Sequence, residues 1–91
     1  MNLRWTQAGL SDLARLHEFL APVNPQAAAR TVQSLTTAAG RLLDHPRIGE
    51  ALEQYEPREV RRLLIGHYEM RYEVQAATIY VLRIWHTRER R

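Results

Sequence analysis

The fold is decided by the stretch Glu59-Val-Arg-Arg-Leu-Leu-Ile-Gly-His-Tyr-Glu-Met-Arg-Tyr-Glu-Val74 and by the run Thr78-Ile-Tyr-Val-Leu-Arg-Ile-Trp85 that follows it. Branched side chains dominate the first part of the stretch. Its second part alternates between apolar and charged residues, which is the period of a β-strand. Gly66 and residues 75–77 provide short turns. We therefore predict three strands, at 61–65, 68–74 and 78–85, joined as an antiparallel meander.

Two amphipathic helices are predicted before these strands. After a short extended opening at 2–5, Thr6 can cap a first helix with one apolar face. That face contains Leu13, Leu16 and Leu20, with Leu10 and Phe19 beside them. The first helix ends before Pro22, and Asn24-Pro25 supplies a cap and a first-turn proline for a second helix. The second helix has a continuous apolar stripe and ends near residues 44–46. The stripe contains Ala28, Val32, Leu35, Ala39 and Leu42.

The order of these elements predicts the fold class. The link between the two helices is short, so we expect them to form an antiparallel hairpin. Between residues 47 and 57 the apolar residues follow neither helical nor strand spacing, which indicates a surface loop with a turn of helix. The expected fold is α+β, ordered β-α-α-β-β-β, with the helical hairpin packed on a small antiparallel sheet whose other face is open. The chain of 91 residues is expected to form one domain, 1–91.

Composition excludes several classes of protein. Hydrophobic residues make up 45% of the chain and charged residues 25%, as in ordinary globular domains. Cysteine is absent and the four histidines form no i, i+4 pair, so neither a metal site nor a cofactor is expected. The signatures of phosphate-binding loops and common hydrolases are missing. There is no membrane-length apolar run and no signal peptide, which predicts a cytoplasmic protein without a membrane partner.

Positive charge is concentrated in the last third of the chain. All 13 basic residues are arginine, and residues 58–91 contain eight of them against four acidic residues, a local net charge of +4. Such an excess indicates an acidic partner, either nucleic acid or an acidic protein segment. The candidate basic surface comprises Arg61, Arg62, Arg71, Arg83, His86, Arg88 and Arg90.

Strand alternation predicts which of these side chains share a face. We expect Tyr80, Leu82 and Ile84 to face the core on the last strand, which directs Arg83 to the open face. Arg71 takes the same face on the middle strand, joined by one of the two arginines at 61 and 62.

The simplest alternative is a solvated polar face without a binding role. In that case strand glutamates such as Glu69 or Glu73 pair with a nearby arginine. The number of arginines and the presence of Trp85 at the same end of the sheet favour a binding surface instead.

Several quoted motifs together point to a family. The ending Leu82-Arg-Ile-Trp-His-Thr-Arg-Glu89 is similar to the "hydrophobic-x-x-His-x-Arg" close of ParE toxins. Asp12-Leu13 in the first helix, Leu43-Asp-His-Pro46 after the second helix and the stretch from Glu59 fit as well. The chain thus resembles, over nearly its whole length, the RelE/ParE toxins of type II toxin–antitoxin modules. The resemblance implies a helical pair on an antiparallel sheet.

The family divides into ribosome-dependent mRNA endonucleases, the RelE branch, and poisons of DNA gyrase, the ParE branch. In the nuclease branch a catalytic arginine follows the residue that opens the middle strand, and Glu69 occupies that place here. A carboxylate there would repel the scissile phosphate. Arg71 and His86 are catalytic candidates only under the nuclease alternative, with His86 as a general acid or base. The resemblance implies a ParE-like gyrase inhibitor that is not an enzyme, with an mRNA endoribonuclease as the alternative.

Either branch implies a cognate antitoxin, whose acidic and amphipathic C-terminal segment wraps the toxin. The expected partners are therefore an antitoxin and DNA gyrase, with the ribosome and its mRNA replacing gyrase under the alternative. A third hypothesis is an inert structural domain whose arginine-rich tail only maintains solubility.

Overall fold

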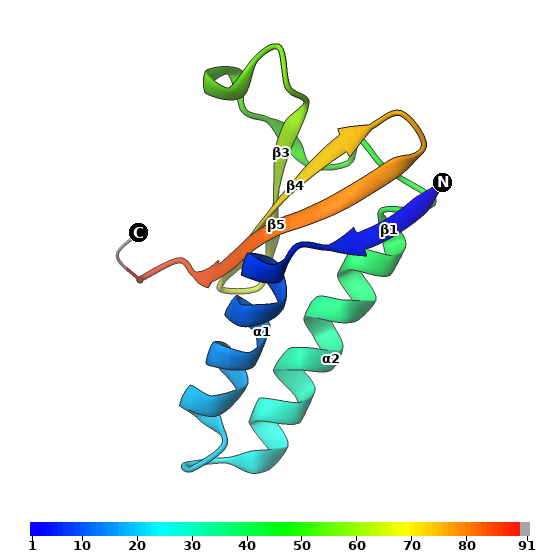
Figure 1. Cartoon of the computed structure of the whole chain (residues 1–91). Coiled ribbons are helices and arrows are strands. Elements are labelled where there is room, and N and C mark those ends of the chain that lie inside the picture. The colour runs from blue at the N-terminus through cyan, green and yellow to red at the C-terminus, as the bar shows by residue number, and fades with distance from the viewer. Residues whose placement is uncertain (90–91) are drawn as a thin grey trace.

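The computed structural model describes residues 1–89, and it contains two helices on one face of a five-stranded sheet (Figure 1). The elements follow the predicted order β-α-α-β-β-β, with a two-residue strand added before the meander and the predicted turn of helix present there as a short 3-10 helix. They are β1 (Asn2–Trp5), α1 (Gln7–Leu20), α2 (Pro25–Arg41), β2 (Glu50–Ala51), η1 (Glu53–Tyr55), β3 (Val60–Ile65), β4 (Tyr68–Gln75) and β5 (Thr78–His86). The α+β class and the antiparallel meander β3-β4-β5 are confirmed.

The sheet is mixed, which corrects the prediction of a purely antiparallel sheet. Its strand order is β1-β5-β4-β3-β2, and β1 pairs with β5 in parallel, from Asn2 opposite Thr78 to Trp5 opposite Val81. At the other edge, β2 pairs antiparallel with β3. The edge strand β1 has four residues and the edge strand β2 has two. Strands this short contain too little alternation for the sequence to indicate which strands they pair with.

The helix starts agree with the capping residues in the sequence. The Thr6 hydroxyl accepts a hydrogen bond from the Gly9 amide at 3.0 Å, and the Asn24 side chain accepts one from Ala27 at 3.0 Å. The predicted apolar face of α1 is too wide, because Leu10 is 53% exposed and Phe19 is 78% exposed. The buried positions of α1 form a narrower stripe that contains Gly9, Asp12 and Leu16.

A β-bulge on β5 changes the residues that reach the core. The register passes from Arg71 opposite Arg83 to Tyr72 opposite Val81, so Leu82 is the extra residue on β5. The prediction that Tyr80 and Leu82 face the core was therefore wrong. Residues before the bulge have the opposite parity from those after it, so Ile79, Val81 and Ile84 are buried instead. The hydrophobic core between the helices and the sheet comprises Leu16, Leu35, Ala39, Leu42, Met70, Tyr72, Val74, Ile79, Val81 and Ile84.

Tyr72 ties the segment after α2 to the sheet. Its side chain is fully buried, its hydroxyl donates to the Pro46 carbonyl at 2.9 Å, and the same oxygen accepts from the Gly49 amide at 2.9 Å. A side chain at position 49 would begin 2.7 Å from this hydroxyl, which explains the glycine. In the part of the chain that the structure describes, neither helix is long and apolar enough to cross a membrane.

Candidate functional surface

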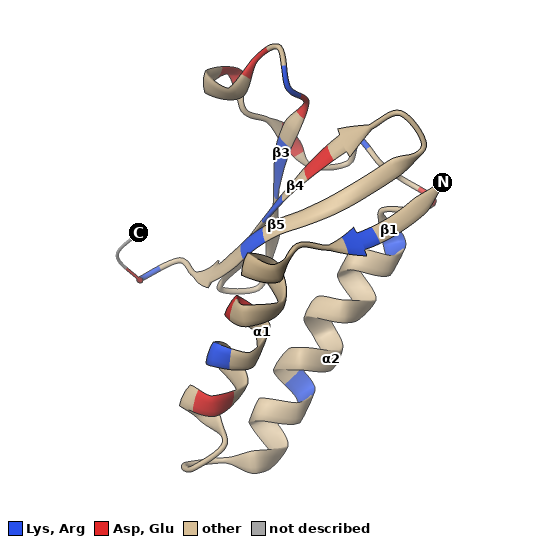
Figure 2. Ribbon diagram, viewed as in Figure 1, with Lys and Arg blue, Asp and Glu red and all other residues tan. Residues whose placement is uncertain are grey.

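Three arginines form a row across the sheet face turned away from the helices. Arg62 lies opposite Arg71 in the β3-β4 pairing, and Arg71 lies opposite Arg83 in the β4-β5 pairing (Figure 2). This confirms that Arg71 and Arg83 share a face, and it identifies Arg62 as the third member. We call these three residues the arginine row.

Two aromatic rings support the row. The guanidinium carbon of Arg71 lies 4.9 Å from the centre of the Trp85 ring and 5.8 Å from that of Tyr55. The guanidinium carbon of Arg83 is 5.8 Å from the Trp85 ring. These distances are within the range of cation–π attraction. Trp85 is therefore nearly buried although it is on the face without helices, and the tyrosine of η1 covers part of that face.

Carboxylates neutralise the arginine row from below and beside it. Arg71 Nε donates to Glu69 Oε2 at 3.0 Å, and Arg62 Nε donates to Glu50 Oε1 at 2.6 Å. Glu69 is 1% exposed, so it is a buried charge and not part of the solvated face that the simplest alternative predicted. Glu69 also lies 3.8 Å from Arg62 of β3, so the cross-strand pairing of that alternative is present, but it lies underneath the arginine side chains.

Glu73 is paired in the same way at the end of β4. Arg58 donates to both of its oxygens, at 2.8 and 3.1 Å, and Glu73 is 4% exposed. These hydrogen bonds hold the pKa of the Glu73 carboxyl below its ordinary value, against the effect of burial. The ionised carboxylate is therefore the form that the fold stabilises.

Asp12 of α1 completes the row, and the sequence patterns did not predict its role. Its Oδ2 accepts from Arg83 Nε at 2.7 Å and from the Ile84 amide at 2.9 Å, while Oδ1 accepts from Arg83 Nη2 at 3.2 Å. Burial raises the pKa of the Asp12 carboxyl, but the Arg83 and Ile84 hydrogen bonds outweigh burial and lower it overall. The signal that could have revealed this role is an aspartate on the buried stripe of an amphipathic helix.

Arg61 lies on the opposite parity from Arg62 and does not join the row. Its guanidinium donates to the Gly49 carbonyl at 2.7 Å and to Glu59 at 2.9 Å. Arg47 also pairs with Glu59, and hydrogen bonds from the two arginines hold the pKa of that carboxyl below its ordinary value. Arg61 thus fixes the segment before β2 to the edge of the sheet.

The C-terminal members of the predicted surface lie at the end of β5. His86 is opposite Tyr68, whose ring is 5.3 Å from the imidazole, and the Arg88 amide donates to His86 Nδ1 at 3.1 Å. Arg90 lies outside the described residues. Tyr68 has the parity opposite to Arg71 on β4, so His86 and Arg71 point to different faces of the sheet. The two catalytic candidates of the nuclease alternative are not brought together.

Ion pairing determines which arginines carry positive charge that no carboxylate neutralises. Of the arginines at residues 1–89, four form no ion pair with a described carboxylate, and those four are Arg4, Arg30, Arg41 and Arg88. Two of these four are on α2, which contains no acidic residue (Figure 2). Within the described residues, no three histidine, aspartate or glutamate side chains are grouped as they would be around a metal ion.

Comparison with known families decides between the branches. The profile of the family described as "ParE toxin of type II toxin-antitoxin system, parDE" matches residues 3–91. The chain belongs to the ParE toxin family. The predicted resemblance to the ParE branch is therefore confirmed, and the protein is a ParE-like toxin of the type II class. Inhibition of gyrase and neutralisation by an antitoxin are typical of ParE toxins.

A solved structure independently supports the ParE fold. The chain is similar to a protein of the chromosomal ParDE toxin–antitoxin system from P. aeruginosa, with a TM-score of 0.79 and 24% sequence identity. The match covers 94% of this chain and 95% of that chain. A search of curated proteins found no match.

Proposed function

We propose that this ParE-like toxin inhibits DNA gyrase and that a cognate antitoxin neutralises it. Membership of the ParE family carries the proposal, because gyrase is the typical target of that family. The arrangement of the sheet is consistent with it. A nuclease of the alternative type would need Arg71 and His86 at one phosphodiester, and here they project from different faces.

The environment of Arg71 also argues against RNA cleavage. Its guanidinium donates to Glu69 at 3.0 Å and to the Tyr55 hydroxyl at 2.7 Å, so it is already paired with a carboxylate and held against the sheet. Stabilising the charge that develops on a phosphate requires a cation aimed at that position and not neutralised by a carboxylate. We assign Arg71 to the integrity of the sheet face.

We assign target contact to the exposed part of the basic surface. Arg83 and Arg62 have side chains that are 53% and 38% exposed, and each guanidinium has five N–H donors, of which the internal pairs use only some. Arg88 is exposed beside His86, and Arg90, the last member of the predicted surface, lies outside the described residues. Arg61 is excluded from this surface because it is committed to the segment before β2.

A supercoiling assay tests the proposal directly. The purified chain should inhibit supercoiling by purified gyrase, or promote gyrase-dependent DNA cleavage, and added antitoxin should restore normal activity. The matched assay is a purified translation system, in which ribosome-bound mRNA should remain intact. Codon-specific mRNA cleavage that is lost on Arg71→Ala or His86→Ala would contradict the proposal and establish the nuclease function instead.

A further inference from the structure

The chain at the end of β5 forms a turn that side chains close. The Glu89 amide donates to the His86 carbonyl at 2.9 Å, and the His86 amide donates to Glu89 Oε1 at 2.8 Å. Within the turn, the Arg88 amide donates to His86 Nδ1 at 3.1 Å. The Thr87 amide donates to the His67 carbonyl at 2.8 Å, which ties the turn to the connection between β3 and β4. We call the segment from His86 to Glu89 the C-terminal turn.

The side chain of Glu89 also joins the C-terminal turn to α1. Its second oxygen, Oε2, accepts a hydrogen bond from Arg15 Nη1 at 2.6 Å. Arg15 Nη2 donates to the Ile84 carbonyl at 3.2 Å, so one guanidinium holds both the end of β5 and the turn that follows it. Figure 1 shows β5 ending beside α1, beyond Val81, the last residue that pairs with β1.

Glu89 lies in a stretch of sequence that is otherwise basic. Residues 74–91 contain four arginines and no other carboxylate. A carboxylate at this end of the chain lowers the positive charge that attracts an acidic partner or nucleic acid. Its ion pair within the described residues is with Arg15, 74 positions away, and not with the neighbouring Arg88. The carboxylate therefore reduces the local charge but fixes the position of the turn.

The Arg15–Glu89 ion pair lies at the surface, where its effect on global stability is small. The two side chains are 44% and 32% exposed. Water screens a pair of this exposure, and both long side chains lose conformational freedom on pairing. Chain ends, however, have the lowest local stability in a protein, so a weak contact is enough to select one arrangement of such an end. The effect of this ion pair should therefore be local.

We propose that Arg15 and Glu89 are positioning residues, whose ion pair holds the C-terminal turn against α1 and presents Arg88 to the target in one arrangement. Arg88 is exposed and forms no ion pair with a described carboxylate, so its guanidinium is available to a partner. A turn that is ordered before binding avoids the cost of ordering on contact, which increases affinity. The inference rests on the proposed function, because it takes the complex of gyrase with DNA as the target.

Inhibition of gyrase by Glu89→Ala separates a positioning role from a purely electrostatic one. This change adds one unit of positive charge, so inhibition should strengthen if the arginines act only through their field. If Glu89 positions the turn, inhibition should weaken, and we expect the concentration for half-inhibition to rise by roughly three- to tenfold. Glu18→Ala is the matched control, because Glu18 is an exposed carboxylate on α1 that forms no ion pair with a described residue. It should inhibit like the unaltered chain.

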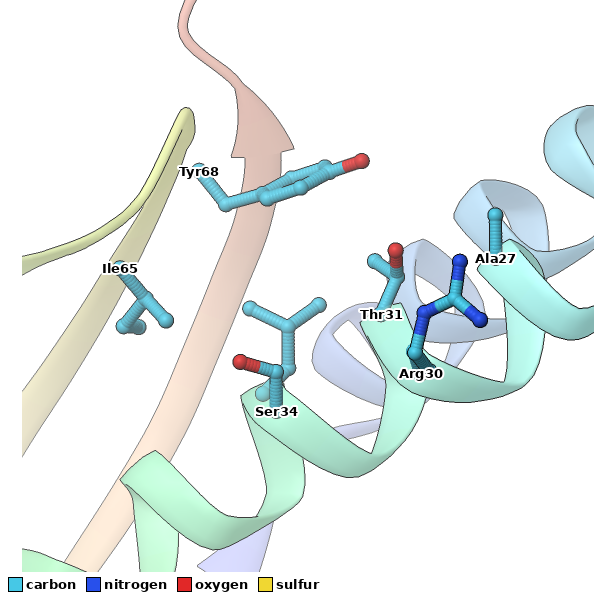
Figure 3. Close-up of a pocket in the computed structure, with 7 residues that line it drawn as sticks. Ala27, Arg30, Thr31, Ser34, Ile65 and Tyr68 are labelled. Atoms are coloured by element: carbon cyan, nitrogen blue, oxygen red, sulfur yellow. The ribbon is translucent and has the colours of Figure 1, made fainter.

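Arg15→Ala tests the other side of the ion pair. It should also weaken inhibition, and the double variant with Glu89→Ala should resemble Arg15→Ala alone, because both changes break the same contact. Arg30→Ala is the control for the loss of a helical arginine and should inhibit like the unaltered chain. Arg30 is exposed on α2, and Figure 3 shows it at the rim of a cavity of about 310 Å³, across from Ile65 and Tyr68. It forms no ion pair with a described carboxylate.

Amide hydrogen exchange measures the order of the C-terminal turn without any target. Exchange at the Thr87 and Glu89 amides should accelerate in both Glu89→Ala and Arg15→Ala, whereas exchange in β4 should not change in Glu89→Ala. Glu18→Ala should leave exchange in the turn unchanged. Urea denaturation should give nearly the same midpoint for Glu89→Ala and the unaltered chain, which shows that weaker inhibition does not result from unfolding.

The outcomes distinguish failure of this inference from failure of the proposed function. Equal or stronger inhibition by Glu89→Ala, or additive losses in the double variant, would overturn the positioning role and leave gyrase as the target. Unchanged exchange in the C-terminal turn of both single variants would overturn it as well. If the unaltered chain does not inhibit gyrase, the proposed function is wrong, and the target named here is wrong with it.

Discussion

Asp12 connects α1 to the exposed edge of β5 through a single carboxylate. β1 pairs with β5 only as far as Val81, and beyond that point Asp12 accepts the Ile84 amide while Arg15 donates to the Ile84 carbonyl at 3.2 Å. The side chains of Asp12 and Arg15 thus make the hydrogen bonds to the Ile84 backbone that a neighbouring strand would otherwise make. The arrangement also holds Arg83 in the arginine row.

Replacing this carboxylate should destabilise the protein measurably. Asp12→Ala leaves the Ile84 amide without its acceptor and Arg83 without its partner, and since Arg83 is half-exposed we expect a loss of about 1–3 kcal/mol in the free energy of unfolding. Urea denaturation gives the value. Glu18→Ala is the control, because Glu18 is an exposed carboxylate on the same helix. Equal effects of the two changes would contradict the assigned role.

The Tyr72 hydroxyl makes a second local prediction. Tyr72→Phe removes the partner of the buried Gly49 amide and of the Pro46 carbonyl, which should cost about 1–3 kcal/mol. Hydrogen exchange at the Gly49 amide should accelerate more than exchange in β4. Tyr80→Phe, at a half-buried tyrosine on β5, should leave both quantities nearly unchanged, and a similar acceleration in that control would reject the anchoring role.

At the scale of elements, α1 approaches β5 closely enough to require a glycine. A Cβ at position 9 would be 2.6 Å from the Val81 carbonyl oxygen, whereas a Cβ at Gly40 would meet no atom within 4 Å. Gly9→Ala should therefore destabilise the protein by about 1–3 kcal/mol through displacement of α1. Gly40→Ala in the last turn of α2 should stabilise it by up to about 0.5–1 kcal/mol. Thermal unfolding should show a lower melting temperature for Gly9→Ala and a higher one for Gly40→Ala. Shifts of the same sign in the two variants would contradict the packing.

The sequence predicted most elements because each has a local signal. Caps at Thr6 and Asn24 and the alternation on β4 need no information from distant residues. The bulge at Leu82 has no such signal, because it depends on how β5 matches its neighbour, and it reversed the inferred faces at Tyr80 and Leu82. Arg83 was placed correctly because it lies beyond the bulge, where the parity assumed from Ile84 holds.

The candidate surface was predictable only in part, for a related reason. Counting charges along the chain located the excess after residue 57, but ion pairs form between residues far apart in sequence, such as Asp12 with Arg83 and Arg15 with Glu89. The sequence therefore could not show which arginines are neutralised. It also could not show that Arg30 on α2 has no ion pair with a described carboxylate.

For the whole molecule, carboxylates paired with arginines predict a loss of stability in acid. The pKa values of Asp12, Glu59 and Glu73 are lowered in the folded state, so protons bind more tightly to the unfolded chain. Their contribution is complete above the unfolded pKa values of about 4 and is lost as the pH falls through the lower folded values.

The free energy of unfolding should thus be steady near neutral pH and fall below about pH 4. Denaturation curves at a series of pH values measure this. The double variant Asp12→Asn with Glu73→Gln should be less stable at pH 7 but less sensitive to acid. If the free energy of unfolding of that variant fell with decreasing pH as steeply as that of the unaltered chain, other groups would be responsible for the acid sensitivity.

The parallel pairing of β1 with β5 also sets the order in which the chain can become a folded toxin. Asn2 is opposite Thr78, 76 positions later, and its amide donates to the Ala77 carbonyl at 2.7 Å. Closing so long a loop is entropically costly, whereas the helical hairpin and the meander form from near neighbours. During synthesis the first strand must therefore wait, unpaired, until the last strand has left the ribosome. Until then its backbone and the edge that it will cover remain open to other chains.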